Sequence, residues 1–253
     1  MLEGKTALYV VDEFDVILDK QVVHTFGEFI KLLSDKGADL KVVLVGVSDS
    51  SRELLAGHPS VRRCLKEIFV EKLSDRNVAD IVVRGAERAK IRFSNLATRI
   101  IVYMSDGFPY FTHLMALQCC EHAIAQGINS VEQPDVLRAV DVVSKDASAT
   151  LSKEFNDATR SYKTEIYKDI LLSAARYRFI EFSTVQIRNS VENSVGNKNN
   201  AAAIGRCLSK LVKDGVLHRV KRGHYKFRDP RMPAYIKIHY RDVDGAGVVV
   251  SMQ

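Results

Sequence analysis

Two apolar runs near the N-terminus, separated by one amphipathic segment, most constrain the fold of this chain. Ala7 to Val11 and Lys41 to Val47 are rich in β-favouring residues and lack the apolar-polar alternation of a half-exposed strand. Between them, Val22 to Asp35 places apolar residues at helical spacing. Such runs are typical of parallel strands, which are buried on both faces and joined by helical crossovers. We therefore expect a parallel sheet covered by helices.

The next segments predict a short third strand and then helices only. Glu67 to Val70 is the expected strand, after a short helical piece from Ser51 to Ala56. Three or four helices follow, broken by Asp106-Gly107 and by Gly127: Asp75 to Ala89, Ser94 to Ser105, Pro109 to Gln126, and Gln133 to Lys145. The fold class expected is α/β, a partial parallel sheet followed by a helical cap.

The remainder of the chain, from Ser152, has a different organisation. Three amphipathic helices and two alternating strands are expected there: Thr164 to Tyr177, Ser183 to Glu192, Asn200 to Asp214, Val216 to Val220, and His224 to Arg228. Three helices followed by a β-hairpin describe a winged helix-turn-helix. The expected domains are therefore residues 1–73 for the sheet, 74–150 for the helical cap and 151–253 for the winged helix.

Charge divides the chain at the same place and indicates a partner. Residues 1–150 carry 18 Lys and Arg against 21 Asp and Glu, a net charge of −3, whereas residues 151–253 carry 19 against 10, a net charge of +9. A strongly basic domain favours a polyanionic partner. On the helix from Asn200 to Asp214, apolar residues form one stripe, and cations mixed with small residues form the opposite face.

Such a face suits the groove of duplex DNA, with phosphate contacts at the start of the helix and along the hairpin. A basic face that binds protein instead is the alternative. The candidate DNA contacts are Lys198, Asn199, Arg206, Lys210, Lys213, Arg219, Lys221, Arg222 and His224.

Composition argues against several other classes of protein. No apolar run approaches the roughly 20 residues of a membrane span, and the N-terminus lacks the pattern of a signal peptide, so a cytoplasmic address without a membrane partner is expected. The four cysteines show no C-x-x-C spacing, which indicates neither a disulfide framework nor a zinc site. Cys119, Cys120 and His122 could bind a metal, but helical neighbours diverge by about 100°, so we favour core packing.

Gly4-Lys5-Thr6 has the ending of a phosphate-binding loop, directly before the first strand. Such a loop needs a glycine five residues before its Gly-Lys pair and a helix directly after it. Only three residues precede Gly4, and a strand follows. We interpret the motif as a polar turn, so the Asp12-Glu13 pair that ends the strand needs an explanation of its own.

In this order the segments resemble the AAA+ ATPases, especially origin-initiator-like and related bacterial or archaeal members with a C-terminal winged helix. The resemblance extends to about Tyr240. Ala7 to Asp15 looks like the Walker B strand, whose aspartate anchors Mg²⁺ through water and whose glutamate polarises the attacking water. The resemblance implies these roles for Asp12 and Glu13, with ATP and Mg²⁺ as the cofactors of a complete member.

The same resemblance implies further contacts with nucleotide. Val42 to Ser50 is similar to the strand of sensor 1, so Ser48 or Asp49 would orient the water near the γ-phosphate. The segment that ends in Arg62 and Arg63 looks like that of an arginine finger, which acts on a neighbouring subunit and so implies a homo-oligomer. The alternative is that the two arginines lie at the end of a helix and interact favourably with its dipole.

Asp106 to Tyr110 resembles the start of the lid helix that bears sensor 2. The family usually has Arg where this chain has Tyr110, which puts direct sensing of the γ-phosphate by this helix in doubt. His113 stands one turn further on. We expect it to be either a substitute ligand or a packed histidine.

The large departure from the family is that its first strand, phosphate loop, following helix and second strand are missing before Asp12. Without the loop, ATP would lose most of its binding energy, and the sheet would lose its central strand. We favour a chain that is the C-terminal portion of a longer ATPase over a degenerate member that survives as an interaction module. By itself the chain is expected to be inactive as an ATP hydrolase.

The function expected is therefore that of an AAA+ ATPase portion coupled to a DNA-binding winged helix. Two alternatives stay open. One is a non-catalytic DNA-binding or regulatory protein. The other is a signalling ATPase whose winged helix binds protein.

Overall fold

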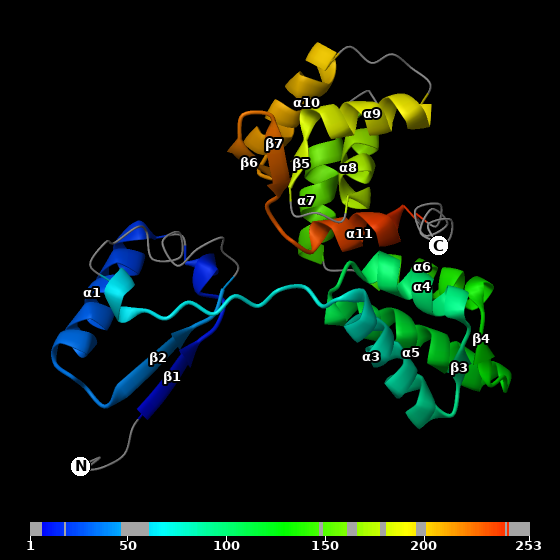
Figure 1. The fold of residues 1–253 in the computed structure, drawn as a ribbon, viewed down its shortest axis with the longest axis horizontal. Helices are drawn as coiled ribbons and strands as arrows, with labels where there is room; N and C mark the ends of the chain where they lie inside the picture. The colour runs from blue at the N-terminus through cyan, green and yellow to red at the C-terminus, as the bar shows by residue number, and fades with distance from the viewer. Residues whose placement is uncertain are drawn as a thin grey trace. The chain divides into compact units, whose positions relative to one another are not determined.

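The chain, drawn as a ribbon in Figure 1, divides after Glu71 into two units, Met1–Glu71 and Lys72–Gln253. Each unit has its own buried core. The finer division that the sequence predicts near residue 150 stays a prediction. The computed structural model describes residues 7–17, 19–46, 61–146, 149–160, 166–177, 181–195, 201–240 and 242. The predicted helical piece from Ser51 to Ala56 lies outside this part of the chain.

The first unit is a small parallel sheet with a helical crossover, as the two apolar runs predict. The strands pair with Ala7 beside Leu40 and Val11 beside Leu44. Its elements are β1 (Ala7–Val11), the 3-10 turn η1 (Phe14–Val16), α1 (Lys20–Asp35), β2 (Leu40–Leu44) and the 3-10 turn η2 (Arg62–Cys64). Asp19 starts the helix by accepting a hydrogen bond from the Gln21 N–H at 2.8 Å.

The core of this unit is small. Among the residues described there, Phe14, Val23, Ile30 and Val61 are the buried members, and the ring of Phe14 lies 5.1 Å from that of Phe26. These residues come from η1, from one face of α1 and from the residue before η2. Packing on Phe14 therefore fixes the point where the chain leaves β1.

The prediction that β1 is buried on both faces is wrong for the structure described. Leu8, Tyr9 and Val10 are 64, 62 and 60% exposed. In the described part of the unit, the sheet has two strands, and α1 is the one α-helix that packs on it. A sheet of that size has too few neighbours to cover both of its faces.

The predicted third strand, from Glu67 to Val70, is also wrong. The chain from Leu65 to Ser74 forms neither helix nor strand, and Ile68 and Val70 are 80 and 93% exposed. A β-strand exists through its hydrogen bonds to a neighbouring strand. No described strand pairs with this segment, so its β-favouring residues are left without a sheet to join.

The second unit begins with four helices, at the positions that the sequence predicts. They are α3 (Asp75–Ala89), α4 (Asn95–Ser105), α5 (Pro109–Gln126) and α6 (Gln133–Asp146), and we call residues 72–146 the helical bundle. Ser74 and Ser94 cap the first two by accepting hydrogen bonds from backbone N–H groups. Two short parallel pieces that were not predicted, β3 (Arg92–Phe93) and β4 (Ser130–Val131), pair beside the bundle.

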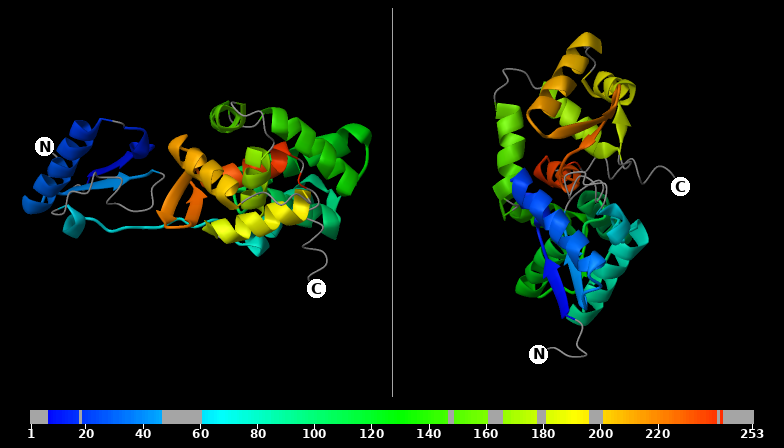
Figure 2. Two further views of the ribbon diagram at one scale, coloured as in Figure 1. Left: turned by 90° about the horizontal axis from the view of Figure 1, so that it is seen from above. Right: turned by 90° about the vertical axis from the view of Figure 1, so that its left-hand side faces the viewer.

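The rest of the second unit that the structure describes, between residues 149 and 242, is called the basic module. Its helices are α7 (Ala149–Arg160), α8 (Ile166–Arg176), α9 (Thr184–Val195), α10 (Ala201–Lys213) and α11 (Met232–His239). Its antiparallel sheet has the order β5-β7-β6, formed by Phe182–Ser183, His224–Phe227 and Leu217–Lys221. Figure 2 shows the β6–β7 hairpin beside α10, both in orange. The sequence predicts α8, α9, α10 and the hairpin, but not α7 or α11.

One continuous hydrophobic core joins the bundle and the module, from Val82 in α3 to Ile238 in α11. From Met232 to Ile238 every residue of α11 is buried. This helix packs against α8 of the module and against α6 and α4 of the bundle. Throughout the described residues, no helix combines the length and the apolar character that crossing a bilayer requires.

The turn between α4 and α5 lies close to the backbone of Leu73, and a substitution can test that close approach. Gly107 has a φ of 81°, and a Cβ atom there would lie 2.7 Å from the Leu73 carbonyl oxygen. Gly107→Ala should lower the free energy of unfolding by about 3 kcal/mol, because strain and a backbone clash add. Urea unfolding followed by far-UV circular dichroism measures the loss.

Gly127→Ala is the matched control for this variant. Gly127 also has a positive φ, 68°, but a Cβ atom there would meet nothing within 4 Å. Only the left-handed conformation is penalised, at about 1 kcal/mol. Equal losses in the two variants would show that the close approach to Leu73 does not constrain the turn.

Candidate functional site

The carboxyl end of β1 carries the first candidate site. Asp12 and Glu13 follow Val11 directly, and both side chains are exposed. Two backbone hydrogen bonds hold the ends of the strands together: the Val45 N–H donates to the Val11 carbonyl, and the Phe14 N–H donates to the Val45 carbonyl, both at 2.9 Å. The two carboxylates therefore stand on a fixed edge, at the end of parallel strands where open α/β sheets bind ligands.

Glu13 has an unusual backbone. Its φ and ψ are 53° and 37°, in the left-handed region, and the Asp12 Oδ1 accepts a hydrogen bond from its N–H at 2.8 Å. The other described non-glycine residues with a positive φ, Lys90 and Asp106, each end a helix, where this conformation is common. Glu13 instead precedes a 3-10 turn, and a strained residue of this kind is a candidate functional position.

The two carboxylates fit the requirements of Mg²⁺, which is usually held through one or two carboxylates, water and substrate phosphates. Within the described residues, no three His, Cys, Asp or Glu side chains gather as ligands for a metal ion. The described chain beside Asp12 and Glu13 also contributes no glycine-rich turn around phosphates. The two carboxylates therefore fit a Mg²⁺ ion, and the described residues beside them do not supply a cradle for phosphates. Ser48 and Asp49, predicted for the same edge, lie outside the described residues.

The predicted arginine pair lies in η2. Val61, directly before it, is 1% exposed and belongs to the core of the first unit, and its carbonyl accepts from the Cys64 N–H at 2.8 Å. The Arg63 side chain is exposed, and of Arg62 only the backbone is described. The turn is thus anchored on the α1 side of the unit and presents Arg63 to solvent.

The predicted lid residues lie in the first turns of α5. Tyr110 is 56% exposed, with its ring edge-on to Phe111 at 5.1 Å, and His113 is exposed rather than packed. Both belong to the second unit, whereas Asp12 and Glu13 belong to the first.

The second candidate site is the outward face of α10. Ile204, Cys207, Leu208 and Leu211 are buried, as the predicted apolar stripe requires. The exposed face bears Arg206, Ser209, Lys210 and Lys213. Lys210 donates to Asp214 at 2.7 Å, and an exposed pair of this kind contributes little to stability, so it can exchange for another anion.

The hairpin continues this cationic surface from its own anchored position. The Thr184 N–H at the start of α9 donates to the carbonyl of Gly223 at 2.9 Å, which holds the tip of the hairpin. Lys221 and Arg222 are exposed at that tip, and His224 is half-buried. Lys198 and Asn199, predicted at the start of α10, lie outside the described residues.

Arg219 differs from the other predicted contacts because it joins the hairpin to α10. Its guanidinium lies 5.5 Å from the centre of the Tyr225 ring and donates to the Ser209 Oγ at 3.3 Å and the Tyr225 hydroxyl at 3.4 Å. Tyr225 is the cross-strand neighbour of Arg219. The sequence interpretation did not include Tyr225, although the alternation of the two strands places it on the same face as Arg219.

Comparison with known proteins gives likenesses of structure only. No protein-family model and no curated protein matches the chain. The Thermotoga maritima RuvB Holliday junction branch migration motor is similar at 14% identity with a TM-score of 0.44, and the match covers 87% of this chain and 75% of that chain. The Aeropyrum pernix ORC2 protein in ADPNP-ADP complexes is similar at 15% identity with a TM-score of 0.48, and the match covers 96% of this chain and 67% of that chain. Cdc6p from Pyrobaculum aerophilum is similar at 15% identity with a TM-score of 0.41, and the match covers 93% of this chain and 66% of that chain.

All three solved structures are AAA+ P-loop ATPases, the family that the sequence resembles. Their identities are low and their TM-scores lie under 0.5. A likeness at that level decides neither site nor activity.

The backbone of Glu13 leads to a prediction about strain. Glu13→Gly should stabilise the first unit by about 1 kcal/mol, because glycine adopts the left-handed conformation without the steric cost of a side chain. Amide hydrogen exchange of α1 measures the change. Glu13→Gln, which keeps the Cβ atom and the strain, should leave exchange unaltered. Faster exchange of α1 in the glycine variant would show that the conformation of Glu13 is not strained.

Proposed function

We propose that this chain is the part of an AAA+ ATPase that carries the Walker B carboxylates, the lid helices and a DNA-binding winged helix. The observation that carries the proposal is the exposed Asp12-Glu13 pair at the carboxyl end of a parallel strand, with Glu13 in a left-handed conformation. Support also comes from the order of the chain, because the arginine pair, the bundle and the basic module follow in the sequence that the resemblance implies.

The roles proposed at the sheet edge follow from the chemistry of the side chains. Asp12 would hold Mg²⁺ through water, and the Glu13 carboxylate would orient a water molecule and accept its proton. ATP, when bound, supplies the phosphoryl group that is transferred. Ser48 or Asp49 would orient the same water, Tyr110 and His113 would lie at the lid, and Arg62 or Arg63 would reach a neighbouring subunit of a homo-oligomer.

The basic module is proposed to bind duplex DNA as a winged helix. Three helices and a hairpin that follow one another suit this motif, and the exposed face of α10 bears cations and small side chains rather than apolar ones. Arg206, Lys210 and Lys213 would enter or border a groove, and Lys221 and Arg222 would contact phosphates. A cytoplasmic address belongs to the same proposal.

Duplex binding tests the module through two of its exposed cations. Lys210→Ala and Arg222→Ala should each weaken binding several-fold and reduce the slope of log affinity against log salt concentration by about 1, since each removes one cation that lies beside the phosphates, at the border of the groove or along the backbone. Fluorescence anisotropy with a labelled duplex at several salt concentrations measures both quantities.

Arg84→Ala is the matched control, because Arg84 is an exposed cation of α3 in the helical bundle. It should leave the salt slope unchanged. Equal effects of all three variants would indicate attraction by net charge alone. An affinity that neither module variant lowers would contradict DNA binding and favour the alternative that the module binds protein.

A non-catalytic DNA-binding protein is the second candidate function. It is favoured by the lack of a glycine-rich phosphate cradle among the described residues beside Asp12 and Glu13. Without backbone N–H groups and a loop lysine around the phosphates, this chain should show no saturable ATP binding at millimolar nucleotide. Isothermal titration calorimetry with Mg²⁺ present measures this, and micromolar binding that Asp12→Ala abolishes would contradict the expectation.

A further inference from the structure

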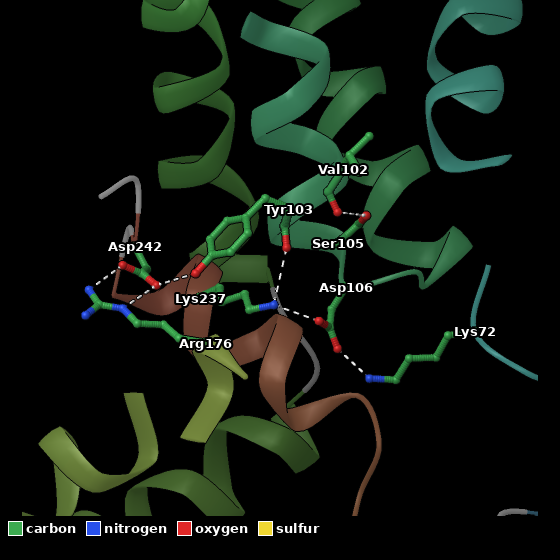
Figure 3. A network of polar contacts seen from close by, with 8 residues as sticks. All are labelled: Lys72, Val102, Tyr103, Ser105, Asp106, Arg176, Lys237 and Asp242. Carbon is green, nitrogen blue, oxygen red and sulfur yellow. Dashed lines mark hydrogen bonds and ion pairs between the residues drawn. The ribbon is translucent and has the colours of Figure 1, made fainter. Parts of the chain in front are cut away.

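Lys237 is a charged side chain in the middle of the hydrophobic core. It belongs to α11, and its side chain is 0% exposed. Its Nζ donates to the Asp106 Oδ1 at 2.6 Å and to the Tyr103 carbonyl at 3.4 Å, and it lies 4.6 Å from the centre of the Tyr103 ring (Figure 3). Burying an ammonium group at such depth costs free energy unless the group is paired and hydrogen-bonded. The position of α11 in the core is therefore fixed by the contact of Lys237 with Asp106.

Asp106 connects three segments that are far apart in the sequence. It follows the last residue of α4 in a left-handed conformation, and its Oδ2 pairs with Lys72, the first residue of the second unit. Next to it, the Leu73 N–H donates to the Gly107 carbonyl at 2.9 Å. One carboxylate therefore binds the start of the unit, the end of α4 and the buried face of α11.

Asp242 makes a second junction of the same kind. Its side chain is 1% exposed, and Arg176 of α8 donates to both of its oxygens, at 3.0 and 2.7 Å. The Tyr103 hydroxyl donates to the Oδ2 at 2.8 Å. Burial, reinforced by the neighbouring Asp242 carboxylate, raises the pKa of Tyr103, so the hydroxyl keeps the proton that it donates. This junction joins α8 of the module to α4 of the bundle.

We propose that these two carboxylates form a clasp that makes the helical bundle and the basic module one rigid body. The clasp consists of Lys72, Tyr103, Asp106, Arg176, Lys237 and Asp242. Apolar packing of α11 supplies affinity between the two parts, but apolar surfaces tolerate sliding and repacking. Buried ion pairs are weak sources of stability, and their better-attested use is to fix one arrangement among several. The clasp thus fixes the orientation of the α10 face relative to α4 and α5.

The consequence for regulation rests on the proposed function. If the bundle is the lid of a nucleotide switch, the clasp makes the basic module rotate together with the lid, by the same angle. Within the described residues after Lys72, the part that responds to nucleotide and the part that binds DNA would then move together.

Lys237→Met tests the clasp, because it keeps the length of the side chain and removes the charge. Hydrogen exchange is measured by mass spectrometry in the full chain at increasing urea. In the unaltered chain, amides of α8 and α10 should become exchange-competent together with those of α3 and α5. In the variant, α8 and α10 should exchange about tenfold faster than the bundle helices, because the two parts open separately.

Two further variants keep the test decisive if Lys237→Met does not fold. Lys72→Met removes the partly exposed partner of the same carboxylate and should give a smaller separation in the same direction. Lys153→Met, at an exposed position of α7 in the basic module, is the matched control and should give none. The proposal would be overturned if the helical bundle and the basic module open separately in the unaltered chain. It would also be overturned if they open together in both Lys237→Met and Lys72→Met.

Duplex binding by the same variants separates this proposal from the proposed function. Independent opening in Lys237→Met, in a chain that does not bind DNA, would support the clasp and remove the DNA-binding function. If the unaltered chain binds DNA but its two parts open independently, the DNA-binding function would be supported and the clasp would be overturned.

Discussion

A carboxylate inside a hydrophobic core requires cations, and the second unit is arranged around that requirement at Asp106. Two ammonium groups reach this side chain, Lys72 from the start of the unit and Lys237 from α11. The left-handed turn that presents the carboxylate needs Gly107 beside it, because the chain at Leu73 leaves no space for a Cβ atom. Capping, turn conformation and charge pairing thus depend on one another at a single point.

The first unit is built under the opposite condition. In the part of it that the structure describes, the short parallel strands carry more apolar surface than α1 covers, and Leu8 and Val10 remain exposed on β1. What holds it together is the small cluster around Phe14, which also sets the direction of the chain at Asp12 and Glu13. A candidate site that stands on so small a core draws its geometry from backbone hydrogen bonds between the strand ends rather than from burial.

The sequence predicts those parts of the fold whose cause is local. Helices of the bundle follow from apolar periodicity and from the breaks at Asp106-Gly107 and Gly127, and their predicted bounds agree closely with the structure. Glu67 to Val70 shows the limit of this reasoning, since its residues favour a strand but a strand also requires a partner that propensity does not report. The helix α11 escaped prediction because Lys237 interrupts its apolar pattern with a charge, although Pro233 near its start is a usual helix signal.

The candidate sites divide in the same way. That Asp12 and Glu13 end a strand is readable from the sequence, and so is the cationic face of α10. The left-handed backbone of Glu13 and the contact between Arg219 and Ser209 are not, because each depends on the path of the chain after a turn. Lys237 is the clearest case. In the sequence it resembles an ordinary polar residue of a helix, and only a carboxylate 131 residues away explains why a lysine can lie where no water reaches it. A charge that interrupts an otherwise apolar helix is therefore a reason to look for a distant counter-charge before the helix is discounted.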